Sequence, residues 1–63
     1  SKLTRREEAI LSRVAKGLSS KAISNELNIS VRTVETHRQN IKSKLDLNTT
    51  AELTKYAYDQ QLL

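Results

Sequence analysis

Residues 30–45 read SVRTVETHRQNIKSKL, and this stretch decides the fold. Within it, apolar residues and one histidine recur at intervals of three and four, which is the spacing of one face of an α-helix. The members of this stripe are Val34, His37, Ile41 and Leu45. Ser30 is a favoured N-cap residue. The stretch therefore predicts an amphipathic helix that begins after Ser30, with His37 as a satisfied packing residue on its inner side.

The opposite face of this predicted helix is polar. It carries Glu35, Arg38, Gln39 and Lys42, with Thr36 and Asn40 at its edge and Arg32 and Lys44 towards its ends. Hydroxyl, amide and cationic groups together can read base edges and neutralise phosphates. A charged outer face is equally the ordinary form of a solvated surface helix. The pattern of this helix alone leaves both interpretations open.

The preceding residues favour nucleic-acid recognition. Residues 19–27 read as a short helix capped by Ser19 or Ser20, and Asn28 and Ile29 form a tight turn before Ser30. Two helices joined by a turn of about three to four residues have the spacing of a helix-turn-helix. The segment 30–45 is then the recognition helix.

Composition excludes several classes of protein. A chain of 63 residues forms one small domain. It has no cysteine and one histidine, so we expect no disulfide, no metal site, no cofactor and no enzymatic activity. A formal charge of +4 and a pI near 9.8 favour polyanionic partners. No apolar run approaches the roughly 20 residues of a membrane span, and we expect a soluble, cytoplasmic module cut from a longer protein.

Two further helices are predicted on either side. Thr4 and Glu7 form a capping box, and Gly17 ends the helix that follows. Thr49 and Glu52 form a second capping box before the last helix. The predicted fold class is all-α with four helices. The last helix has a second, weakly apolar side that either pairs two copies of the chain or covers the end of the core; its members are Ala51, Thr54 and Tyr58.

Motifs along nearly the whole chain resemble the LuxR-type helix-turn-helix domain. They are Leu3-Thr4 with Arg6-Glu7, Ala15-Lys16-Gly17, Leu27-Asn28-Ile29-Ser30, Thr33-Val34-Glu35-Thr36-His37, Asn40-Ile41, Lys44-Leu45, Ala51-Glu52-Leu53 and Tyr56-Ala57. Such domains are the C-terminal DNA-binding output domains of bacterial response regulators of the NarL/FixJ type and of quorum-sensing receptors. The resemblance implies that residues 1–63 are one such domain, with its helix-turn-helix at about 20–39 and a dimerisation helix at about 50–60.

The resemblance also assigns roles to individual residues. Base-reading positions of the family fall on Glu35, Thr36 and Gln39. Phosphate-contacting positions fall on Ser20, Lys21, Arg32, Thr33, Arg38 and Lys42. The dimer contact falls on the last helix. Read without the family, Ser20 and Lys21 are equally a helix start and a solvated lysine.

Departures from the family pattern concern caps, turns and one site residue. The second helix lacks the acidic residue of a capping box at Ala22, and glycine is frequent in the family at the positions of Asn28, Asp46 and Gln61. Many members carry lysine where this chain has Glu35. A carboxylate there either accepts from a cytosine amino group or pairs with Arg38 three residues later, and we favour the pair.

The sequence therefore predicts a transcriptional regulator that binds double-stranded DNA as a homodimer, with RNA polymerase as a further candidate partner and no small-molecule ligand in this segment. The expected parent is a two-component response regulator, and a quorum-sensing receptor is the alternative. A different class of function is also open: the basic face of the same fold binds an acidic protein.

Overall fold

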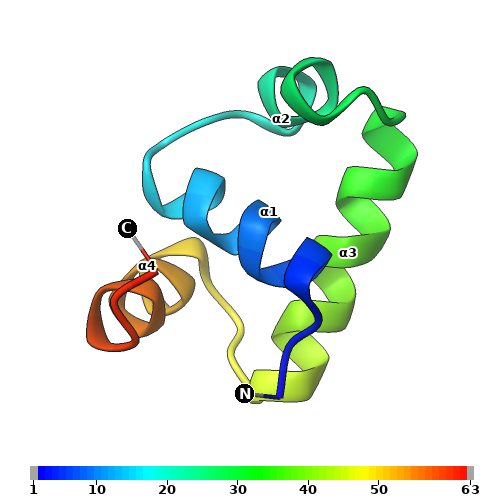
Figure 1. Ribbon diagram of the computed structural model, residues 1–63. Coiled ribbons are helices and arrows are strands. Elements are labelled where there is room, and N and C mark those ends of the chain that lie inside the picture. Colours follow the sequence, from blue (N-terminus) through cyan, green and yellow to red (C-terminus); the bar gives the residue numbers. More distant parts are fainter. Residues whose placement is uncertain (1, 63) are drawn as a thin grey trace.

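The computed structural model describes residues 2–62, which form four helices and contain no strand. The helices are α1 (Arg5–Ala15), α2 (Ser20–Leu27), α3 (Val31–Leu45) and α4 (Thr50–Asp59). This confirms the all-α, four-helix class. In Figure 1, α1 lies in the middle of the molecule, α2 and α3 pack on one side of it, and α4 packs on the other.

Each helix begins at a hydroxyl N-cap. The caps are Thr4, Ser19, Ser30 and Thr49, and each side chain accepts a hydrogen bond from a backbone N–H in the first turn. The capping boxes predicted for α1 and α4 are both present. Helix α2 is capped by Ser19 alone and has no capping box. Its third residue is Ala22, whose side chain cannot accept a hydrogen bond from the backbone N–H of Ser19.

Each helix also ends in the same way. A residue in the left-handed conformation follows it, namely Gly17 (φ 93°), Asn28 (φ 57°), Asp46 (φ 55°) and Gln61 (φ 57°). The next residue in each case is apolar, and its N–H donates to a carbonyl five residues back, at 2.9–3.1 Å. Those residues are Leu18, Ile29, Leu47 and Leu62, and all four pack against the core. This is the Schellman arrangement, which satisfies the last carbonyls of a helix.

The core is aliphatic and gathers around α1. Its buried members are Leu3, Ile10, Leu11, Val14, Ile23, Val34, Ile41, Leu53 and Ala57. Every helix contributes at least one of them, so α1 serves as the shared packing surface of the other three. Within residues 2–62, none of the helices has the length and hydrophobicity that a membrane-spanning helix requires.

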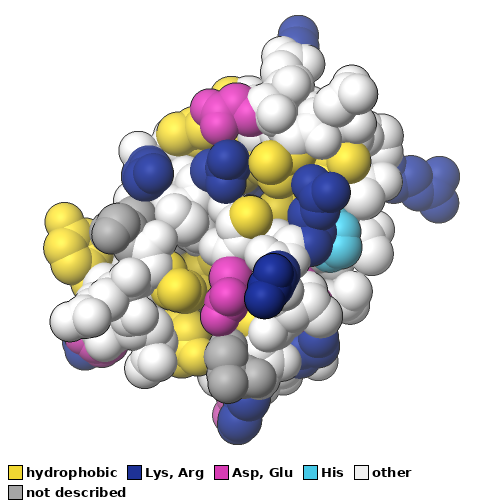
Figure 2. Space-filling view, in the orientation of Figure 1, with side chains coloured by type: hydrophobic (Ala, Val, Ile, Leu, Met, Phe, Trp, Pro, Cys, Tyr) yellow, Lys and Arg dark blue, Asp and Glu magenta, His cyan; other side chains and the backbone are white. Residues whose placement is uncertain are grey.

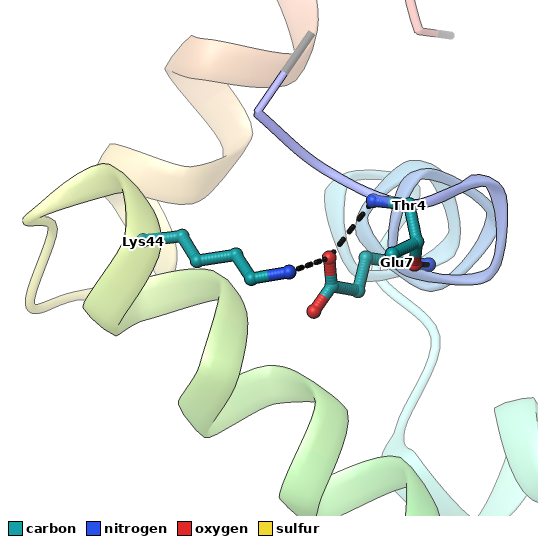
Figure 3. A network of polar contacts seen from close by, with 3 residues as sticks. All are labelled: Thr4, Glu7 and Lys44. Atoms are coloured by element: carbon teal, nitrogen blue, oxygen red, sulfur yellow. Dashed lines mark hydrogen bonds and ion pairs between the residues drawn. The ribbon is translucent and has the colours of Figure 1, made fainter.

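Among residues 2–62, two ion pairs between side chains connect one helix to another. The Nζ of Lys44 in α3 lies 2.8 Å from Oε1 of Glu7 in α1, and the Glu7 side chain is only 4% exposed. Figure 3 shows that the same oxygen accepts from the backbone N–H of Thr4, at 2.9 Å. The hydrogen bond from Lys44 lowers the pKa of Glu7 below its ordinary value, and the bond from Thr4 lowers it further. A second pair joins Arg13 in α1 to Glu26 in α2, at 2.9 Å.

Candidate nucleic-acid interface

Helices α2 and α3 are joined by three residues and pack against each other, as the predicted helix-turn-helix requires. Asn28 turns the chain in the left-handed conformation, and Ile29 anchors the turn on the core. Ser30 then caps α3 by accepting from the Thr33 N–H at 3.0 Å. Because cap and turn leave little freedom, the direction in which α3 leaves α2 is fixed locally.

The inner side of α3 is the predicted stripe. Val34 and Ile41 are fully buried, and Leu45 packs partly buried against the core. His37 is half-buried on the same side, but its Nδ1 is buried with no hydrogen-bond partner among the described residues. The prediction that His37 is a satisfied packing residue is therefore wrong for this nitrogen.

The outer side of α3 is open to solvent. The three predicted base-reading residues, Glu35, Thr36 and Gln39, are all exposed. A shallow, open groove of about 380 Å³ continues from this side, lined by Gln39, Lys42, Ser43, Asp46, Leu47 and Asn48. Since an α-helix fits the major groove only if its reading face is uncovered, this exposure is the first geometric requirement for base contact.

The predicted phosphate-contacting residues flank this face. Lys21, Arg32 and Thr33 are exposed, and Ser20, Arg38 and Lys42 are half-buried. The Thr33 hydroxyl lies 2.8 Å from that of Ser30, so it belongs to the cap of α3 as well. Figure 2 shows Lys and Arg side chains projecting from the rim of the molecule where Figure 1 places α2 and α3. The structure thus brings together the cations of two helices around one exposed helix face.

Glu35 does not pair with Arg38 within residues 2–62. Its carboxylate instead accepts a hydrogen bond from the hydroxyl of Ser20, the first residue of α2. Arg38 approaches the same hydroxyl, with Nη1 3.5 Å from Oγ. Three predicted site residues therefore meet in one contact between α2 and α3. Spacing along one helix could not reveal it, since Ser20 lies fifteen residues before Glu35.

Lys44 takes no part in this outer face. Its ammonium group is held by the buried Glu7, so it ties the end of α3 to α1. The sequence pattern placed Lys44 towards the end of the polar face. Its pairing with Glu7 could not be predicted from the sequence, because the two residues lie thirty-seven positions apart.

The predicted pairing face of α4 is largely open to solvent. Tyr58 is 68% exposed, Ala51 is exposed and Thr54 is half-buried. The Thr54 hydroxyl donates to the Thr50 carbonyl at 2.9 Å, which leaves methyl and ring surface on this side. Because α4 packs on α1 (Figure 1), it leaves the outer face of α3 uncovered.

Comparison with known proteins places this geometry in context. Residues 1–57 match the family described as "Bacterial regulatory proteins, luxR family". The chain is 46% identical over 61 residues to the oxygen regulatory protein NreC of Staphylococcus haemolyticus. It is also 46% identical over 61 residues to the transcriptional regulatory protein MctR of Rhizobium johnstonii. Each alignment covers 97% of this chain and 28% of the relative.

Proposed function

Because the chain belongs to the luxR family of bacterial regulatory proteins, whose helix-turn-helix it forms, we propose that α3 reads the major groove of a specific DNA site. Membership makes the chain a DNA-binding domain of a transcriptional regulator and not an enzyme. The observation that carries the proposal is the exposure of Glu35, Thr36 and Gln39 on one side of α3. Base edges are read by amide, hydroxyl and carboxylate groups of this kind.

Phosphate contacts surround these readers in the proposed complex. Lys21 and Arg32 stand exposed at the starts of α2 and α3, and Lys42 lies one turn beyond Gln39. Cations at both ends of a reading helix fix its register on the backbone without specifying sequence. The net charge of +4 supports attraction to the duplex over longer distances.

Two copies are proposed to bind together. The side of α4 that carries Ala51, Thr54 and Tyr58 supports this arrangement, because Ala51 and Tyr58 are exposed there and Thr54 is only half-buried. A two-fold pair of copies requires two half-sites on one face of the duplex, roughly 10 base pairs apart or a multiple of that spacing.

The parent protein is proposed to be a cytoplasmic response regulator. The chain spans 28% of the length of NreC and MctR, whose names describe regulators. The basic charge suits a compartment where the duplex is the abundant polyanion. In such a parent, this domain would form the output end of the chain.

A titration with duplex DNA tests the proposal. The chain is added to a fluorescein-labelled duplex pool of random sequence at two salt concentrations, and bound duplexes are recovered and sequenced. We expect affinity to fall steeply with salt, by a slope of about 0.9 per phosphate contact, and a defined sequence to be enriched. Affinity without sequence enrichment, matched by an acidic polypeptide of equal charge, would instead support the protein-binding alternative.

A further inference from the structure

The hydroxyl of Ser20 is shared between two charged groups of α3. It donates to the carboxylate of Glu35, and Nη1 of Arg38 lies 3.5 Å from its oxygen. A serine hydroxyl has one proton to donate, and an arginine can only donate. The single proton of Ser20 is therefore committed to Glu35, and the oxygen is left to accept from Arg38.

The local charge explains why Glu35 takes this position. Helix α2 has no acidic residue in its first turn, and its cap, Ser19, satisfies only the Ala22 N–H. The positive end of a helix dipole attracts anions. Glu35 supplies from α3 the negative charge that α2 does not provide for itself, and the contact is exposed to solvent.

A DNA phosphate at Ser20 would need the same proton. Phosphate oxygens accept hydrogen bonds from hydroxyls and from helix N-termini in the way that a carboxylate does. Glu35 and phosphate are then two anions in competition for one donor, with the cations of Lys21 and Arg38 beside it. Both cannot hold the proton at once.

We infer that Glu35 is an internal competitor of DNA phosphate at Ser20, and that it weakens binding to duplexes of arbitrary sequence. This inference rests on the proposed function. Ser20 contributes to phosphate binding only where Glu35 has left it. Glu35 thus acts on specificity by suppressing the sequence-independent part of the affinity, which comes largely from phosphate contacts.

A double-mutant cycle tests this competition. Affinity for one fluorescein-labelled duplex of arbitrary sequence, roughly 20 base pairs long or two helical turns, is measured for wild type, Ser20→Ala, Glu35→Ala and the double variant. Removing the charge of Glu35 strengthens binding by general electrostatics, but equally in both Ser20 backgrounds. The informative quantity is therefore the loss of duplex affinity caused by Ser20→Ala, compared between the chain with Glu35 and the chain with Glu35→Ala.

We expect Ser20→Ala to change the affinity less than about twofold in wild type and to lower it about fivefold in the Glu35→Ala background, as for an exposed charge-assisted hydrogen bond. An equal cost in both backgrounds, including no cost in either, would overturn the inference while leaving DNA binding intact. A larger cost in wild type would show that the contact supports binding and would overturn it as well. If the wild-type chain bound no duplex at all, that result would overturn the proposed function itself.

Both substitutions leave the fold intact on structural grounds. Ser19, and not Ser20, caps α2, and Glu35 is exposed on α3. Circular dichroism of the four proteins checks this before titration. A Glu35→Gln variant provides a third background for Ser20→Ala, because it removes the charge and keeps an acceptor for the Ser20 hydroxyl. Its Ser20→Ala cost is expected to lie between those of the other two backgrounds.

Discussion

Lys44, in the last turn of α3, donates to the buried carboxylate of Glu7, in the first turn of α1, across 2.8 Å. The same carboxylate oxygen accepts from the backbone N–H of Thr4. One side chain thus completes the cap of α1 and holds the end of α3. The orientation of α3 depends on this contact as well as on the apolar core.

Replacement of Lys44 by methionine is expected to destabilise the domain. The change keeps the aliphatic stem but leaves the carboxylate of Glu7 buried without its cation. Because Lys44 is 41% exposed, water offsets part of the loss, and we expect the free energy of unfolding to fall by about 1–2 kcal/mol. Urea unfolding followed by circular dichroism measures it. Lys55→Met, which breaks the exposed pair with Asp59, is the control and should cost less than about 0.5 kcal/mol. Equal losses would contradict the special role of Glu7.

Stability is expected to fall in acid, mainly through Glu7. Its pKa in the folded chain lies below the ordinary value of 4.5, so its contribution is complete above that pH and is lost as the pH falls through the folded pKa. The melting temperature should be nearly level from pH 7 to about 5 and drop below that. In Glu7→Gln the drop should be shallower, although the starting stability is lower. If the melting temperature of Glu7→Gln fell with pH in parallel with that of wild type, the acid sensitivity would come from other carboxyl groups.

Asp46→Gly is expected to stabilise the chain. Asp46 ends α3 at φ 55°, where a residue with a Cβ is strained, and its carboxylate stands at the negative end of the helix dipole. The greater freedom of glycine in the unfolded chain offsets part of the gain, which leaves about 0.5 kcal/mol. Asp46→Ala, tested beside it by urea unfolding, should lose about 1 kcal/mol. A gain from alanine would mean that charge, and not backbone conformation, governs this position.

Substitutions of the predicted phosphate-contacting residues and of the predicted base-reading residues are expected to change DNA binding in different ways. Lys42→Ala and Arg38→Ala should each weaken binding to all duplexes and reduce the salt slope by about 0.9. Gln39→Ala should instead reduce the preference for the selected site. We expect the free energy of binding to that site to become less favourable by about 1–3 kcal/mol. Fluorescence anisotropy at several salt concentrations measures both effects. Lys55→Ala, an equal charge change on α4, should leave the slope almost unchanged; a comparable fall there would mean that only net charge matters.

Tyr58→Ala is expected to reduce pairing on DNA without unfolding the domain. The ring is 68% exposed in the single chain, so its removal should change the free energy of unfolding by less than about 0.5 kcal/mol. Binding to a duplex with two half-sites should lose cooperativity, while binding to a single half-site stays the same. Gel-shift titrations of the two duplexes distinguish these effects. An unchanged two-site titration would remove Tyr58 from the pairing surface.

The elements of the fold could be predicted from sequence because their signals are local. Hydroxyl caps such as Thr4 and Thr49, and left-handed ends such as Gly17, depend on residues within one turn. The stripe of α3 followed from periodicity alone. Contacts between helices could not be predicted in this way, because periodicity identifies which face is buried and not which side chain it meets. Ser20 with Glu35 and Glu7 with Lys44 became visible only once the helices were packed.

The place of α1 between α3 and α4 has a consequence for how such a domain can diverge. Substitutions on the solvent side of α3 would alter its proposed recognition of DNA, and substitutions on the exposed side of α4 would alter its proposed association with a second copy. No ion pair among residues 2–62 joins a side chain of α3 to one of α4. Gene duplication could therefore retarget one property while the other is inherited unchanged. Helix α1, which packs against both α3 and α4, would then separate two properties that can change independently.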